Sequence, residues 1–155
     1  MVDESIDYQG EKALLLDPTR DDPAEHLCFH VKSSLGLVAP AMRDGKASER
    51  GAMSIQVYGL NRLGLVQDRT RLLRRLEFLG ELVIDMGLLI QDFENPAALE
   101  PLKQAGLAHA GPTLRLMQDA MLHEMLEMSA CDAPYSAIAS AWLERFVERL
   151  TIGEM

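Results

Sequence analysis

Residues 96–112 read PAALEPLKQAGLAHAGP, and the prediction of fold and function depends on how this stretch is interpreted. It is a short helix-like run that presents one histidine, His109, just before a Gly-Pro break. An imidazole that faces an apolar pocket can ligate a heme iron, whereas one that faces solvent or a neighbouring carbonyl belongs to an ordinary helix end. The role of His109 therefore decides which function is assigned.

The composition favours one all-α domain. A chain of 155 residues is long enough to bury about two-thirds of its unfolded surface. Hydrophobic residues make up 48% of it and aromatic residues only 5%, and the abundant Leu, Met and Ala favour helices over strands. We predict an acidic N-terminal tail over residues 1–21 and an all-α domain of about six to seven helices over residues 22–155.

The charge distribution disfavours polyanionic partners. The formal net charge is −9, and one basic cluster stands out, formed by Arg69, Arg71, Arg74 and Arg75. Binding to nucleic acid or to an anionic membrane depends on a positive surface, so we expect neither partner. We interpret the cluster as the solvated start of a helix, with contact to an anion such as a phosphate or a propionate as the alternative.

The cysteines and the N-terminus indicate a cytoplasmic protein. Cys28 and Cys131 have no metal-ligand spacing and no partner close in sequence, which suits a reducing compartment. The acidic N-terminus lacks the basic and apolar regions of a signal peptide, and we expect no membrane-spanning stretch.

Apolar periodicity predicts the helices. Asp22-Pro23 provides a cap and a proline at the first helical position, so a first helix is expected over residues 22–39. The longest helix is expected from Asp68 or Thr70 to about Gln91, and later helices should start at Asn95-Pro96, after Gly111-Pro112 and near residues 132–134. No segment alternates convincingly with a period of two, so no strand is predicted.

The order of these segments resembles the globin superfamily, especially single-domain bacterial globins and sensor globins, over about residues 23–155. The resemblance rests on the colinearity of several stretches and not on one motif. They are LGLVAP (35–40), the long helix followed by NPAAL (95–99) and GLAHA (106–110), AML (120–122), and Ala141-Trp142 followed by Phe146.

The resemblance implies a heme site. In globins the histidine that matches His109 is the axial ligand of the heme iron, so His109 is the predicted metal ligand. Phe78 and Leu82 would line the opposite side of the heme, and Ala105 completes the predicted cofactor-binding set. The sequence departs from the family at residues 63–68, which read LGLVQD in place of the connector with its usual phenylalanine.

Other residues favour structural interpretations. His26 and His30 have the spacing of a helical metal site, but no Glu or Cys completes it, so they are interpreted as surface residues. His123 and the methionines from Met117 to Met128 are interpreted as structural residues and core. No phosphate loop, nucleophile elbow or metalloprotease motif occurs, so we do not predict an enzyme.

Two functions remain open, beside an unrelated helical bundle. The first is a globin-like heme protein that binds a diatomic gas (O2, NO or CO) for sensing, storage or detoxification. The second is a heme-free globin-fold module for regulation or protein interaction, acting as a homodimer across its last two helices. The missing connector phenylalanine favours the second.

Overall fold

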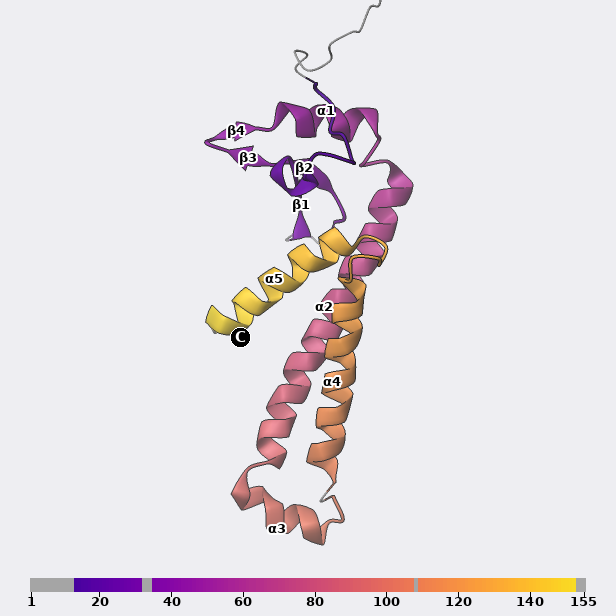
Figure 1. Ribbon diagram of the computed structural model, residues 1–155. Helices are drawn as coiled ribbons and strands as arrows, with labels where there is room; N and C mark the ends of the chain where they lie inside the picture. The colour runs from indigo at the N-terminus through magenta and orange to yellow at the C-terminus, as the bar shows by residue number, and fades with distance from the viewer. Residues whose placement is uncertain (1–12, 32–34, 108, 153–155) are drawn as a thin grey trace, which may run out of the picture.

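The axis of the protein is the 31-residue helix α2 (Leu63–Phe93), as the computed structural model shows (Figure 1). The structure describes residues 13–31, 35–107 and 109–152. Helix α4 (Ala110–Met128) returns antiparallel along α2, and α3 (Pro96–Gln104) crosses the tip of this hairpin. Helix α5 (Ser136–Ile152) packs across the upper part of α2.

Helix α2 forms where apolar residues recur at intervals of three and four. Its buried stripe includes Leu73, Leu76, Leu79, Val83 and Ile90. The helix ends before Asn95, whose side chain accepts a hydrogen bond from the Ala97 amide, and Pro96 then starts α3. This is the predicted cap and proline signal, and it is confirmed.

The core lies where α2, α4 and α5 meet. Leu73, Leu76, Met125 and Ile138 are fully buried there. The Trp142 and Phe146 rings stack with centroids 5.1 Å apart. They sit against Gly80 of α2, where an added Cβ would lie 2.7 Å from Trp142 Cη2. Glycine at this position therefore allows α5 to approach α2 closely.

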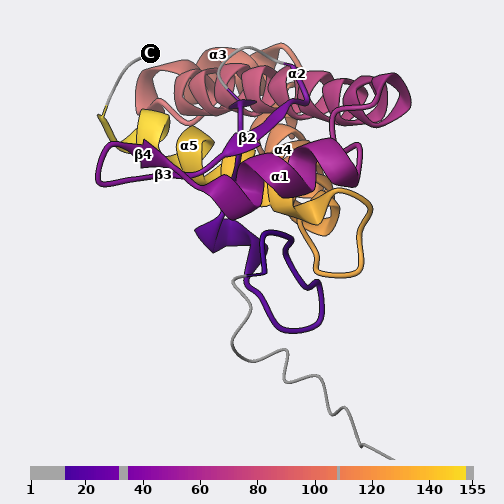
Figure 2. The same cartoon turned by 90° about the horizontal axis from the view of Figure 1, so that it is seen from above.

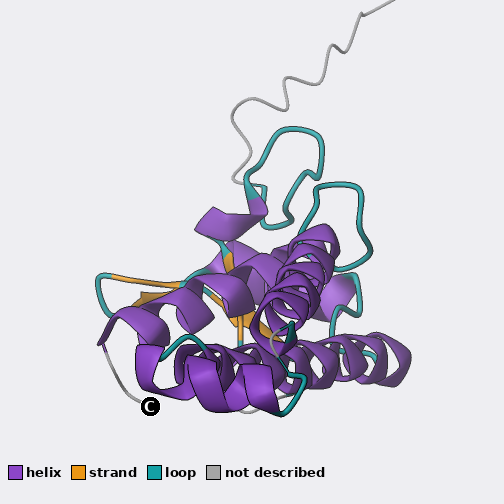
Figure 3. Ribbon diagram, turned by 90° about the horizontal axis from the view of Figure 1, so that it is seen from below, coloured by secondary structure: helices purple, strands orange, loops and turns teal. Residues whose placement is uncertain are grey.

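The N-terminal part is a small mixed layer. The 3-10 helix η2 (Pro23–Glu25) leads into β1 (Leu27–Phe29), which pairs antiparallel with β2 (Val38–Pro40). A second two-stranded pair, β3 (Met42–Arg43) and β4 (Lys46–Ala47), precedes α1 (Glu49–Val57). Figure 2 shows α1 across the middle of the view and α2 along its upper edge, and Figure 3 shows how short the strands are beside the helices.

Part of the predicted acidic tail packs on α1. Leu16 is buried, its amide donates to Ser54 Oγ at 2.9 Å, and its carbonyl accepts from Tyr58 Oη at 2.9 Å. Asp21 accepts two hydrogen bonds from the Arg50 guanidinium, at 3.1 and 2.5 Å. The segment from residue 13 to 21 is therefore fastened to the N-terminal layer.

The structure is mostly helical, as predicted, but two details of the prediction are wrong. The described residues contain five α-helices, fewer than the predicted six to seven, and they contain strands where none was expected. The helix expected over residues 22–39 is replaced by η2, β1 and β2. Its start signal yields only one 3-10 turn because the next main-chain groups bond to a distant segment, as in the Ala41 amide donating to the His26 carbonyl.

In the described parts of the chain, none of the helices is long and apolar enough to cross a membrane.

Candidate functional site

The structure places the four predicted heme residues in two regions. His109 is exposed at the N-cap of α4, and its carbonyl accepts hydrogen bonds from the amide and hydroxyl of Thr113. Ala105 is exposed at the C-cap of α3, at the same tip. Phe78 and Leu82 lie on the middle of α2, and Phe78 is about 22 Å along the helix axis from Phe93 at the tip. The four residues therefore do not converge on one pocket.

A cavity of about 340 Å³ does lie at this tip, between the end of α2, α3 and the start of α4. Its described lining is Phe93, Glu94, Leu102, Lys103, Leu107, Gly111 and Pro112. His109 is not in this described lining, and its side chain is exposed. The residues that line this cavity do not fit an enclosed heme with a histidine ligand. Heme and gas binding rest on the resemblance alone and stay a prediction.

An ion pair joins the two helices beside this cavity. The Arg115 guanidinium donates to both carboxylate oxygens of Glu94, at 2.6 and 2.5 Å. These hydrogen bonds lower the pKa of Glu94 and raise that of Arg115. Bidentate geometry of this kind favours a defined orientation. The pair thus links the end of α2 to the second turn of α4.

The other histidines have local partners. His26 Nδ1 lies 2.8 Å from Ser48 Oγ, and His123 Nε2 lies 3.3 Å from Glu127 Oε1. His26 and His30 flank β1, so the helical spacing that suggested a metal site does not exist. Within the described ranges, no three His, Cys, Asp or Glu side chains gather as a metal site would require.

Arg69 anchors three segments and is not a solvated residue. Only 4% of its surface is exposed, and its guanidinium donates to the Gly36 carbonyl at 2.8 Å and to the Leu60 carbonyl. Burial lowers the pKa of Arg69. An added Cβ at Gly36 would lie 2.2 Å from Arg69 Cβ, so the close approach needs glycine. The interpretation of the basic cluster as solvated is therefore wrong for Arg69.

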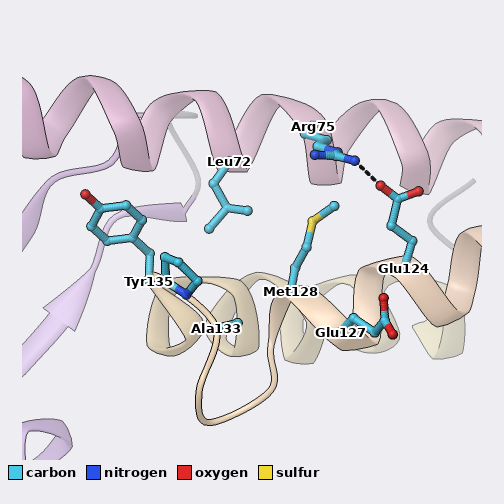
Figure 4. Close-up of a pocket in the computed structure, with 8 residues that line it drawn as sticks. Leu72, Arg75, Glu124, Glu127, Met128, Ala133 and Tyr135 are labelled. Atoms are coloured by element: carbon cyan, nitrogen blue, oxygen red, sulfur yellow. Dashed lines mark hydrogen bonds and ion pairs between the residues drawn. The ribbon is translucent and has the colours of Figure 1, made fainter.

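The rest of the basic cluster is exposed on α2. Arg71 bonds to Asp68 at 2.9 Å, and Arg75 bonds to Glu124 of α4. Figure 4 shows the Arg75–Glu124 pair beside a cleft of about 440 Å³, with Leu72, Met128 and Tyr135 along its wall. The cleft is open to solvent and runs between α2, α4 and the turn before α5.

The surface best suited to bind a partner is a stripe of α2 that faces away from the core. This stripe is called the outward face. It consists of Arg71, Arg74, Phe78, Glu81, Leu82, Asp85, Leu89 and Asp92, at helical intervals of three and four. Phe78 is 59% exposed and Leu89 47% exposed. Phe78 lies on the side of α2 opposite the buried Leu76 and Val83, so its ring points away from the core.

Sequence reasoning missed this surface for a simple reason. It assigned Phe78 to the inside of a pocket because the resemblance to globins put it there. The signal that was available is the alternation of apolar and charged residues on one stripe, which is distinct from the stripe through Leu73, Leu76 and Val83.

Comparisons with known proteins give one partial relationship. The chain is similar to Septu protein PtuB of Bacillus mycoides (strain KBAB4), with 36% identity over 76 residues. The match covers 49% of this chain but 23% of PtuB, so the chain spans less than a quarter of that protein. No family model matches the chain, and no solved structure matches it. No globin is among these matches, so the globin resemblance stays a prediction.

Proposed function

We propose that this chain is a heme-free protein-interaction module that presents the outward face of α2 to a partner. The observation that carries this proposal is the exposed ring of Phe78 at the centre of that face. Single exposed apolar residues are ordinary. Here Phe78, Leu82 and Leu89 follow one another along a single helix face, which is the arrangement of anchors in helix-mediated recognition.

The charged residues around these anchors suit an interface. Interfaces combine an apolar centre with a polar rim, and aromatic side chains are enriched at their energetic centre. Phe78 supplies the centre, and Arg74 and Glu81 lie on either side of it along the stripe. Because these positions belong to a regular helix, their spacing is fixed before a partner arrives, which lowers the entropic cost of binding.

The similarity to PtuB supports a modular role. The matching segment makes up less than a quarter of PtuB. A segment that is a small part of a larger protein is typical of a module that recurs in different proteins. The proposal requires only one helix face, so it does not depend on a globin-like arrangement of the helices. It also accounts for the exposure of Phe78, which the gas-binding hypothesis would bury against a heme.

Site-specific photo-crosslinking in the producing cells tests the proposal. The photoreactive p-benzoylphenylalanine replaces Phe78 in one variant and Leu116 in a matched control. Leu116 lies on α4 and is 72% exposed, so it is at least as accessible to chance collisions. We expect a discrete adduct from position 78 and little from position 116. Equal yields at both positions, or no adduct from position 78, would contradict an interaction through this face.

The gas-binding hypothesis has a separate test. Protein supplied with heme should show a Soret band that His109→Ala abolishes if His109 is an axial ligand. A spectrum without that band, or one unchanged by His109→Ala, would rule out the predicted ligation. A band lost in the variant would instead establish it.

A further inference from the structure

The outward face carries opposite charges at its two ends. Toward the start of α2 it presents Arg71 and Arg74, and toward the end it presents Glu81, Asp85 and Asp92, with Phe78 between the two groups. In the described ranges, the side chains of Arg74, Glu81 and Asp85 make no hydrogen bond or ion pair. Arg71 bonds only to Asp68, in an exposed pair between side chains that are 75% and 48% accessible. Exposed pairs of this kind contribute little and exchange readily.

From this arrangement we propose that the partner is a second copy of this chain, which packs antiparallel along the outward face with a two-fold axis near Phe78. The inference rests on the proposed function and names its partner. Arg71 precedes Phe78 by seven residues and Asp85 follows it by seven. Both therefore lie on the same stripe, about 10 Å along the helix from the two-fold axis at Phe78. An antiparallel copy therefore places Arg71 of each chain opposite Asp85 of the other.

Symmetry makes this contact self-complementary. In a two-fold interface every pair occurs twice, so two Arg71–Asp85 pairs flank the two Phe78 rings. The rings and the neighbouring Leu82 side chains form the apolar centre. A parallel alignment would set arginine against arginine and carboxylate against carboxylate, which costs free energy.

The net charge makes the alignment selective. At −9 per chain, two copies repel each other in most orientations. A contact between copies has to bring local opposite charges together, and the outward face does this in the antiparallel orientation. The face is one helix wide and runs for about 30 Å from Arg71 to Asp92, so the interface is small and the dimer is expected at high protein concentration.

Charge reversal tests the pairing by sedimentation equilibrium of the full chain. Arg71→Glu places glutamate against Asp85, and Asp85→Arg places arginine against Arg71. Each single variant should raise the dimer dissociation constant at least about tenfold, because each repulsion occurs twice. The double variant Arg71→Glu with Asp85→Arg restores opposite charges and should dimerise like the wild type. Glu144→Arg on α5, off this face, should leave dimerisation unchanged.

A mixture of the two single variants gives the sharpest result. Arg71→Glu and Asp85→Arg each repel their own copies, yet the mixed pair matches opposite charges at both contacts and should form a heterodimer. A wild type that stays monomeric at the highest concentration reached, or a double variant that remains as weak as the singles, would overturn the proposal. Thermal melts of the variants show whether each one folds, and the two independent singles keep the test valid if one of them does not.

The crosslinking experiment separates this inference from the proposed function. An adduct from position 78 with the mass of two chains supports both. An adduct of another mass overturns the second copy as partner but supports an interaction module. No adduct from position 78 contradicts both.

Discussion

The two halves of α2 differ in how they are held. The proximal half, residues 69–83, is packed by α4 and α5 and is tied to the N-terminal layer by Arg69, and Leu73 and Leu76 are completely buried there. Among the described elements, the distal half, residues 84–93, has α4 and α3 beside it (Figure 1). There Leu88 remains 50% exposed and Leu89 47% exposed. One continuous helix therefore combines a half that is firmly packed on its inner side and presents Phe78 on its outer side with a thin hairpin that leaves Leu88 and Leu89 exposed.

The largest effect is expected from removing the ring that fills the proximal core. Trp142 is 6% exposed and stacks on Phe146. Trp142→Ala should lower the free energy of unfolding by about 3–5 kcal/mol, through lost burial and the cavity it leaves. Leu116→Ala, at an exposed site on the distal hairpin, should change it by less than about 0.5 kcal/mol. Urea unfolding measures both, and a similar cost at the two sites would contradict the difference between the halves.

The buried guanidinium should come next. Arg69→Met keeps an apolar chain of similar shape but leaves the carbonyls of Gly36 and Leu60 without their hydrogen bonds, which should cost about 2–3 kcal/mol. Arg74→Met is the matched control, because Arg74 is exposed on the same helix, and its cost should fall within about 0.5 kcal/mol of zero. Equal denaturation midpoints for the two variants would show that Arg69 is not an anchor.

Two glycines of α2 should respond in opposite directions. At Gly80 an added Cβ meets the Trp142 and Phe146 rings at 2.7 and 3.0 Å, so Gly80→Ala should destabilise the protein by about 1–3 kcal/mol. At Gly87 the nearest atom is Gln118 Nε2 at 3.2 Å, which donates a hydrogen bond to the Val83 carbonyl and has to shift by only a few tenths of an ångström. Gly87→Ala should therefore stabilise the protein by up to about 1 kcal/mol, through helix propensity. Thermal unfolding of the two variants gives the signs, and a loss of stability at position 87 equal to that at position 80 would refute the contrast.

The same division explains what the sequence predicted well. The long helix was expected from Asp68 or Thr70 to Gln91 and extends from Leu63 to Phe93. Its apolar stripe and the Asn95-Pro96 start of α3 are local signals that survive in the structure. The last helix was expected near residues 132–134 and begins at Ser136.

The failures involve partners that are distant in sequence. Strands β1 and β2 are three residues long, and their pairing is completed by contacts of Asn61 with Val38, which no local pattern reveals. The burial of Arg69 depends on Gly36 and Leu60 coming together in space. Whether an apolar residue such as Phe78 faces a core or an exposed stripe depends on where the neighbouring helices lie, and that information is tertiary.

The smallest effects on stability should come from two ion pairs, Arg50–Asp21 in the N-terminal layer and Arg115–Glu94 at the tip of the hairpin. Hydrogen bonds from Arg50 and from the Asp17 amide hold the pKa of Asp21 below its ordinary 3.8. The Arg115 guanidinium likewise lowers the pKa of Glu94 from 4.5. A carboxyl pKa that is lowered in the folded state stabilises the protein at pH values above the ordinary pKa. This stabilisation is lost as the pH falls through the folded-state pKa. Carboxyl titrations followed by NMR should give midpoints below 3.8 for Asp21 and below 4.5 for Glu94. Arg50→Met should raise the pKa of Asp21 alone, and Arg115→Met should raise the pKa of Glu94 alone.

Hydrogen exchange of α2 at low and high protein concentration tests the central claim, that a second copy packs on the outward face, which passes through Phe78 and continues along residues 84–93. Dimer formation adds stability with concentration. Amides of residues 84–93, which α3 and α4 alone support in one chain, should exchange more slowly in concentrated solution. Amides of α1, which lies off the outward face, should gain much less. Exchange in residues 84–93 that does not change with concentration would contradict the account.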